Sequence, residues 1–237
     1  MHDAHSALLS RLLGPTKDVG ISDVRAVAIQ SLNGAATVGG TSGGLGNELD
    51  QQVLLTMRSW ADLILVTATT ADAESYGPVQ LSTEAQQKRT NRGQAPLPTL
   101  VLWDRSLNAI RQSAHLQELA QHPNTVILTH TSTHTANSEL TLPRAITYQG
   151  EGAEALAALR EHLPHSARVS VEGGPHVYSE LLGAGLVDTL HLSISPVISE
   201  HIEHPLFAPE HAVHLEPEFV HVEGLIFTRL RVRRGDE

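Results

Sequence analysis

The chain has 237 residues, with 16 Lys and Arg against 26 Asp and Glu, and no cysteine. The formal net charge of −10, counted with neutral His, disfavours binding to nucleic acid or to an anionic membrane surface, and neither is expected as a partner. The lack of cysteine excludes disulfide scaffolds, Cys-containing zinc sites and thiolate catalysis. A hydrophobic content of 41% with only 3% aromatic residues indicates a globular chain with an aliphatic core.

Residues 1–20 predict an amphipathic helical extension that ends at Gly14-Pro15, and residues 21–237 predict a single domain. The N-terminus lacks the basic and apolar regions of a signal peptide, and no apolar stretch approaches the roughly 20 residues of a membrane span. We therefore expect a cytoplasmic protein. The apolar face of the extension consists of Leu8, Leu9, Leu12 and Leu13.

The first half of the domain alternates strand-like and helix-like segments. Val24–Ile29 predicts a strand, and Asn47 is placed to cap a helix with an apolar stripe. Asp62–Val66 predicts a buried strand. The polar stretch Ser82–Pro98 ends in Pro-Leu-Pro and predicts a surface insertion.

The second half of the domain continues the alternation of strands and helices, and its last segments predict strands without a helix between them. Leu190–Ser195 alternates apolar and polar residues as a half-exposed strand does, and Phe219–Val232 predicts a hairpin that turns at Glu223-Gly224. This order of elements favours an α/β fold with a single mixed, mostly parallel sheet flanked by helices and an antiparallel C-terminal hairpin. The other predicted strands are 99–102, 125–128, 145–148 and 168–171, and the other predicted helices are 115–121, 152–163 and one that begins at Pro175.

Glycine is concentrated in two segments that each follow a strand. The first, Gly39–Gly46, contains a G-x-S-x-G pattern around Ser42, which is typical of the nucleophile of α/β-hydrolases. That nucleophile needs a turn that joins a strand directly to a helix, whereas this segment begins several residues after the strand. A flexible loop that closes over a ligand and an ordinary surface loop are the other interpretations.

The second segment is Glu172-Gly173-Gly174-Pro175-His176-Val177, at a predicted joint between a strand and a helix. Glycines let the backbone approach a ligand closely, and the amides and dipole at a helix start bind anions such as a pyrophosphate. A carboxylate at the carboxyl end of a strand faces the ligand crevice in α/β sheets. An ordinary tight turn is the alternative interpretation.

Other polar residues have two interpretations each. Arg58 is placed to contact a ligand phosphate or the carboxyl end of its own helix. Thr67, Thr69 and Thr70 follow a strand and supply hydroxyl groups either to a ligand or to a loop. The histidine pairs at i, i+3 spacing lie near prolines and indicate solvated surface residues, so no metal is expected. These pairs are His162/His165, His201/His204 and His211/His214.

Several separated motifs, taken together in their order, resemble the riboflavin-biosynthesis pyrimidine reductase family. This family is the reductase half of the bifunctional deaminase-reductase, and the resemblance implies a dihydrofolate reductase-like fold over residues 24–232. The stretches that carry the resemblance are Ser31-Leu32-Asn33-Gly34, Arg58, Leu65–Thr70, Glu74, Tyr76-Gly77-Pro78, Glu172-Gly173-Gly174-Pro175 and Leu181–Asp188.

The resemblance also implies roles for individual residues. Glu172 and Asn33 would act in catalysis. The chain departs from the family at two points: many members have Asp at the position of Asn33, and a substrate-binding arginine of the family is replaced near Leu81. Substrate contacts would come from Ser31, Gly43, Arg58, Pro78 and Glu172. Cofactor contacts would come from Ile29, Leu45, Thr67, Thr70, Glu74, Gly173, Gly174, Pro175, His176 and Val177.

The resemblance implies an NADPH-dependent reductase that forms a homodimer and acts on a small phosphorylated pyrimidine or a pterin. The substrate it implies first is 5-amino-6-(5-phosphoribosylamino)uracil. The alternatives are a pterin reductase of the dihydrofolate reductase type, a non-catalytic protein that binds a dinucleotide or a flavin precursor, and a hydrolase that uses Ser42.

Overall fold

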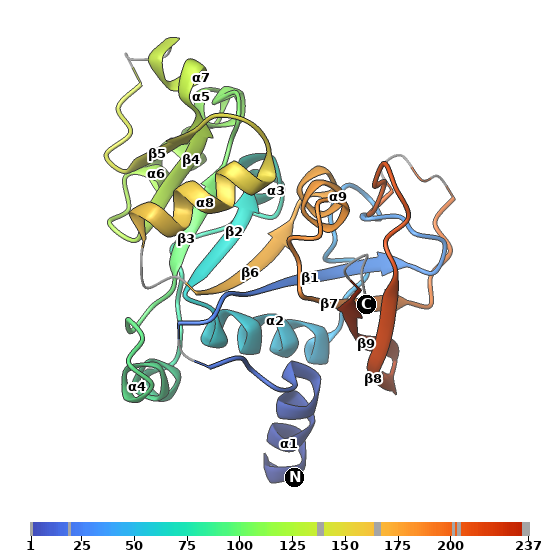
Figure 1. Cartoon of the computed structure of the whole chain (residues 1–237). Helices are drawn as coiled ribbons and strands as arrows, with labels where there is room; N and C mark the ends of the chain where they lie inside the picture. Colours follow the sequence, from blue (N-terminus) through green and yellow to red (C-terminus); the bar gives the residue numbers. More distant parts are fainter. Residues whose placement is uncertain are drawn as a thin grey trace.

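The computed structural model describes residues 2–18, 20–136, 140–163, 167–200, 202 and 205–233. Within these residues a nine-stranded sheet runs through the molecule, with helices on both of its faces (Figure 1). The strands are β1 (Asp23–Ser31), β2 (Leu63–Thr67), β3 (Thr99–Trp103), β4 (Thr125–His130), β5 (Ala145–Tyr148), β6 (Arg168–Gly173), β7 (Thr189–Ser195), β8 (Leu215–Glu223) and β9 (Leu225–Val232). The helices are α1 (His2–Leu13), α2 (Glu48–Trp60), α3 (Ala68–Ala73), α4 (Thr83–Asn91), α5 (Asn108–Gln112), α6 (Ala114–Ala120), α7 (Thr131–Ala136), α8 (Gly152–His162) and α9 (Pro175–Gly183).

The sheet is mixed and mostly parallel, as the sequence predicts. Its strand order is β5-β4-β3-β2-β6-β1-β7-β9-β8. Neighbouring strands from β5 to β7 are parallel, whereas β9 is antiparallel to both β7 and β8. The predicted C-terminal hairpin is therefore confirmed as β8 and β9.

Alternate side chains of the central strands enter separate cores because helices cover both faces of the sheet. Leu63 and Leu65 of β2 belong to the core that includes α8 and α9, whereas Ile64 and Val66 belong to the core that includes α3, α5 and α6. Helices α1 and α2 pack against β9 through a further apolar cluster that includes Leu12, Leu49, Val53 and Phe227. None of the helices in the described ranges is long and apolar enough to cross a membrane.

The predicted helix after Asn47 is confirmed as α2. The Asn47 side chain accepts a hydrogen bond from the backbone N–H of Asp50 at 2.9 Å, which satisfies one of the free amides at the helix start. The buried stripe of the helix is Leu49, Val53, Met57 and Trp60. This stripe sets the rotation of α2 about its axis and therefore decides which polar residues point away from the core.

One prediction about exposure is wrong and another is incomplete. The stretch Ser82–Pro98 lies mostly at the surface as predicted, but it contains α4 and the fully buried side chain of Arg89. Strand β7 is not half-exposed, since His191 and Ser193 are buried along with the apolar residues. The polar face of β7 is buried because α1 and α2 cover that side of the sheet, a long-range arrangement that apolar alternation along one strand does not reveal.

Candidate active site

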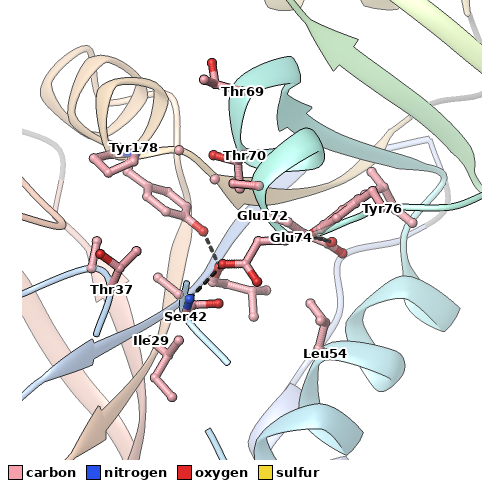
Figure 2. A pocket seen from close by; sticks show the side chains of 18 of the residues that line it. Ile29, Thr37, Ser42, Leu54, Thr69, Thr70, Glu74, Tyr76, Glu172 and Tyr178 are labelled. Carbon is pink, nitrogen blue, oxygen red and sulfur yellow. Dashed lines mark hydrogen bonds between the residues drawn. The ribbon is translucent and has the colours of Figure 1, made fainter. Parts of the chain in front are cut away.

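The candidate site is a cavity of about 1220 Å³ at the carboxyl ends of β1, β2 and β6 (Figure 2). Strand β6 lies between β1 and β2 in the sheet, although it follows both in the chain. In open α/β sheets, ligands bind in the crevice outside the carboxyl ends of the strands, where the strand order reverses. The cavity occupies that position.

Helix α2 forms one wall of the cavity with residues one turn apart. Asp50, Leu54 and Arg58 all line it. Residues at i, i+4 spacing share one face of a helix, so the stripe beside the buried one is turned toward the cavity. Arg58 therefore faces the site, and its predicted alternative, a contact with the end of its own helix, is not what the structure shows.

Glu172, at the carboxyl end of β6, is the centre of a charged cluster. Its carboxylate accepts hydrogen bonds from Arg58 Nε at 3.0 Å to each oxygen and from Arg58 Nη2 at 2.7 Å. The Tyr76 hydroxyl donates to the same carboxylate at 2.9 Å, and the Arg58 guanidinium lies 4.8 Å from the centre of the Tyr76 ring. The Glu172 side chain is only 1% exposed, so its negative charge depends on these partners.

The contacts of the cluster shift the pKa values of Arg58 and Tyr76. Burial alone would lower the pKa of Arg58, but the Glu172 carboxylate raises it above its ordinary value. Burial, together with the charge of Glu172, raises the pKa of the Tyr76 hydroxyl well above 10, so this hydroxyl remains a proton donor in the hydrogen bond. Tyr76 is a site residue whose role the sequence did not predict.

Gly173 and Gly174 form a tight cradle between β6 and α9. The peptide bond between them is cis, and Gly173 has a φ of +130°, a conformation that favours glycine. A Cβ atom on Gly174 would lie 2.7 Å from Thr70 Oγ1 and 3.2 Å from Thr67 Oγ1. The absence of side chains at these two positions lets the backbone pass close to the two threonines and leaves the start of α9 open to the cavity.

The two threonines are held by each other. Thr67 Oγ1 caps α3 by accepting from the backbone N–H of Thr70 at 3.2 Å, and it donates to Thr70 Oγ1 at 2.9 Å. The residues that follow the predicted strand Asp62–Val66 therefore cap and begin helix α3. The hydroxyl groups lie at the carboxyl edge of β2, where the sequence predicts a ligand contact.

A second cavity of about 270 Å³ shares Thr69, Thr70 and the residues Gly174–His176 with the first. Arg105, which follows β3, lines it and is 40% exposed. Its Nη2 atom contacts Glu151 at 2.9 Å and Glu180 at 3.1 Å, and its Nε atom donates to the Tyr148 hydroxyl at 3.2 Å. The two cavities thus adjoin each other at the start of α9.

The glycine-rich segment Gly39–Gly46 lies over the main cavity, which Gly40 and Ser42 line. The backbone N–H of Ser42 donates to Glu74 Oε1 at 2.7 Å, a contact that joins this loop to the end of α3 (Figure 2). Ser42 lies well beyond the end of β1, and α2 begins only at Glu48. The structure therefore does not provide the strand-turn-helix position that a hydrolase nucleophile needs.

Asp50 is a second site residue for which the sequence predicts no role. It lies in the first turn of α2 and lines the cavity. Burial raises the pKa of Asp50 above its ordinary value, although a hydrogen bond with Ser193 partly opposes this shift. A half-buried carboxyl group with a raised pKa in a cavity is a candidate proton donor.

The structure brings most of the predicted site residues together. Besides those already described, Ile29, Pro78, Pro175 and His176 line the main cavity, and Thr67 and Val177 line the second one.

Four predicted residues are not among those that line either cavity: Ser31, Asn33, Gly43 and Leu45. The Ser31 hydroxyl donates to Asn33 Oδ1 at 2.7 Å, and the Asn33 amide exchanges hydrogen bonds with the backbone of Ser199, both at 2.9 Å. Asn33 thus ties two loops together. Leu45 is buried.

Among the described residues no group of three or more His, Asp or Glu side chains is arranged to hold a metal ion. Of the predicted histidine pairs, His165, His201 and His204 lie outside the described residues.

The fold and the site together define the class of protein: an α/β protein with a mixed, mostly parallel sheet and a ligand-binding cavity at its carboxyl edge. The family follows from comparison with known proteins. Residues 23–223 match the RibD C-terminal domain, so the chain belongs to this reductase family of riboflavin biosynthesis, and the predicted resemblance is confirmed. No curated protein sequence matches the chain significantly.

Solved structures agree with this assignment. A pyrimidine reductase-like protein from Corynebacterium diphtheriae is 32% identical over 90% of this chain and 92% of that one, with a TM-score of 0.78. A riboflavin biosynthesis reductase from Saccharomyces cerevisiae, 15% identical over 96% and 97% of the two chains, shares the fold with a TM-score of 0.63. A deaminase/reductase from Thermotoga maritima is 18% identical with a TM-score of 0.67, and this chain covers 57% of its length.

Proposed function

We propose that this protein is an NADPH-dependent reductase whose substrate is 5-amino-6-(5-phosphoribosylamino)uracil. The observation that carries the proposal is that the Glu172 cluster and the glycine cradle open into the same cavity. One group can orient a heterocyclic ring while the other holds a dinucleotide beside it. The Thermotoga maritima neighbour is named as a reductase of this uracil compound, which supports the choice of substrate.

The residues present fit a nicotinamide dinucleotide. Thr67 and Thr70 would contact its phosphates, and the backbone at Gly174 and the start of α9 would face the pyrophosphate, since the cradle would be filled by any Cβ atom. When bound, NADPH supplies the reducing equivalents for the reaction. Binding both reactants in one cavity would supply orientation and exclude water.

Arg105 supports a preference for NADPH over NADH. It lines the second cavity, beyond the start of α9 from the Glu172 cluster, and a guanidinium at the adenosine end of a dinucleotide favours a 2′-phosphate. Glu151 is 73% exposed and can turn away from Arg105 when a phosphate takes its place. Arg105→Gln is therefore expected to weaken NADPH binding about tenfold and leave NADH binding unchanged. An equal loss for both dinucleotides would contradict this role.

Within the cavity, Glu172 and Asp50 have different tasks in the proposed reaction. Glu172 is held in place by its hydrogen bonds with Arg58, and its carboxylate accepts hydrogen bonds from ring N–H groups and orients the substrate. Asp50 lies on the α2 wall of the cavity, two turns before Arg58, and burial raises its pKa, so its protonated form can supply a proton to the substrate nitrogen beside the reduced carbon.

A pterin such as dihydrofolate is the second candidate substrate, because the Asp50 carboxyl can pair with the amino and ring N–H donors along one edge of a pterin. The test measures loss of NADPH absorbance with the uracil compound and with dihydrofolate in parallel. Faster turnover of the uracil compound supports the first proposal, and faster turnover of dihydrofolate supports the second. Binding of NADPH without oxidation with either compound would leave only the dinucleotide-binding interpretation.

We also propose that the protein forms a homodimer through the hairpin at the edge of the sheet. Val220 and Val222 of β8 are 53% and 69% exposed, and Ile198 is 72% exposed. Exposed apolar residues on an edge strand favour pairing with another copy of the chain. Light scattering after size exclusion would test this, and Val222→Lys should shift the protein toward a monomer.

A further inference from the structure

The α4 segment, residues 82–95, holds the carboxyl end of α2 in a clamp of side-chain hydrogen bonds. Arg89, in the last turn of α4, is 1% exposed. Its Nη1 atom donates to the backbone oxygens of Ser59 at 3.0 Å and of Ala61 at 2.5 Å, and its Nε atom donates to the oxygen of Ala95 at 2.9 Å. In Figure 1, α4 stands apart from the layers that flank the sheet, at the end of α2 from which the chain enters β2.

Two other side chains from the same segment complete this clamp. Gln94 Nε2 donates to the oxygen of Trp60 at 2.9 Å and to Asp62 Oδ1 at 2.7 Å, and Arg92 Nη2 donates to the oxygen of Ser59 at 3.2 Å. The last carbonyl groups of a helix have no partner within the helix, and cations are favoured beside them. Side chains from the α4 segment therefore order the final turn of α2.

This final turn carries Arg58, which binds Glu172 with two of its nitrogen atoms. The α4 segment also continues from the wall of the site that faces α2. Tyr76 and the residues up to Gln80 line the cavity, and the chain then enters α4 through its cap, Ser82. The α4 segment thus ties together the two walls that supply Arg58 and Tyr76 to Glu172.

We propose that Arg89 is a positioning residue: by capping α2 it holds the Arg58 guanidinium in its two-nitrogen contact with Glu172 and thereby sets the orientation of the ring substrate. Its effect on turnover rests on the proposed function, whereas its effect on the geometry of Arg58 does not. A displacement of a substrate-orienting group by about 1 Å can reduce catalysis by up to about 100-fold. The dinucleotide, held at the start of α9, lies outside the reach of this clamp.

The kinetic test is a double-mutant cycle of Arg89→Met and Arg58→Met, with Lys88→Met as the matched control. Lys88 lies beside Arg89 on α4, but it is 67% exposed and pairs with Glu84. Arg89→Met is expected to raise KM for the ring substrate and lower kcat/KM about tenfold while dinucleotide Kd stays within about twofold. In the Arg58→Met background the same change should alter kcat/KM less than about twofold. Equal losses in both backgrounds would show a merely structural role and overturn the proposal.

An independent test needs no turnover. The side-chain Nε–H signal of Arg58 in ¹⁵N NMR spectra, assigned by its loss in Arg58→Met, should shift and exchange faster with water in Arg89→Met but remain unchanged in Lys88→Met. An unchanged signal in folded Arg89→Met would overturn the proposal even if the enzyme were active. A shifted signal without any turnover would instead refute the proposed function alone. Should Arg89→Met not fold, Gln94→Leu is judged by the same two criteria.

Discussion

Gly174→Ala tests the glycine cradle most directly. The added Cβ atom would lie 2.7 Å from Thr70 Oγ1, about 0.7 Å inside the 3.4 Å at which ordinary contact begins. Thr70 cannot simply yield, because its hydroxyl oxygen accepts a hydrogen bond from Thr67 Oγ1, which itself lies 3.2 Å from the new atom. Overpacking of this kind typically costs about 1–3 kcal/mol, and the strain is relieved by moving the backbone of residue 174 into the cavity.

We therefore expect Gly174→Ala to lower the free energy of unfolding by about 1–3 kcal/mol. Dinucleotide Kd should rise at least about tenfold, which corresponds to about 1.4 kcal/mol, or one lost hydrogen bond to a phosphate. Urea denaturation and fluorescence titration with NADPH measure the two effects. Gly77→Ala is the matched control, because Gly77 also lines the cavity but nothing lies within 4 Å of an added Cβ atom.

A second substitution separates crowding from other effects. Thr70→Ala removes the hydroxyl that the new Cβ atom meets, so Gly174→Ala should cost less free energy of unfolding in the Thr70→Ala background than in wild type. Wild-type dinucleotide affinity in folded Gly174→Ala would refute the cradle. An equal loss of stability in both backgrounds would refute the crowding at Thr70.

Three further predictions concern ionisable groups. Glu172→Gln should leave dinucleotide Kd unchanged and lower kcat/KM at least about tenfold in steady-state assays, because the charge that orients the ring is lost; unchanged turnover would remove Glu172 from the mechanism. Burial raises the pKa of Asp50, so the wild-type protein loses stability as the pH rises through that pKa. In urea denaturation, Asp50→Asn should therefore be more stable than wild type at neutral pH, and by a smaller margin in acid. An equal difference in both buffers would contradict this. Burial, with Arg25 and Arg229 nearby, lowers the pKa of His191 from 6.5 to about 3, so wild type should lose stability as the pH falls from 6.5 toward 3, and His191→Leu should reduce this loss in a series of Tm measurements.

Features set by short-range sequence were predictable. The cap of α2 at Asn47, the glycine turn after Glu172 and the hairpin at Gly224 each depend on residues a few positions apart, and the structure confirms all three elements. The alternating order of strands and helices also led to the correct sheet type. Glu172 was predicted because a carboxylate at the carboxyl end of a strand in an α/β sheet faces the ligand crevice.

Residues whose role depends on a distant partner were missed or misassigned. Arg89 was counted with a polar surface stretch, yet it is buried because the carbonyl groups of α2 surround it. The place of Asp50 in the cavity depends on how α2 is rotated against the sheet. The catalytic role that the resemblance implies for Asn33 stays a prediction, and its amide is hydrogen-bonded to the backbone of Ser199.

The sequence by itself thus determined the strands and the longer helices of this protein, the turn chemistry between them and its family. Only the tertiary structure decided which polar groups meet. The insertion of β6 between β1 and β2 brings Glu172 next to Arg58 and Tyr76, two residues that lie about a hundred positions earlier in the chain. The physical reason is that propensities and caps act over a few residues, whereas the pairing of buried charges is set by strand order and helix packing across the whole chain.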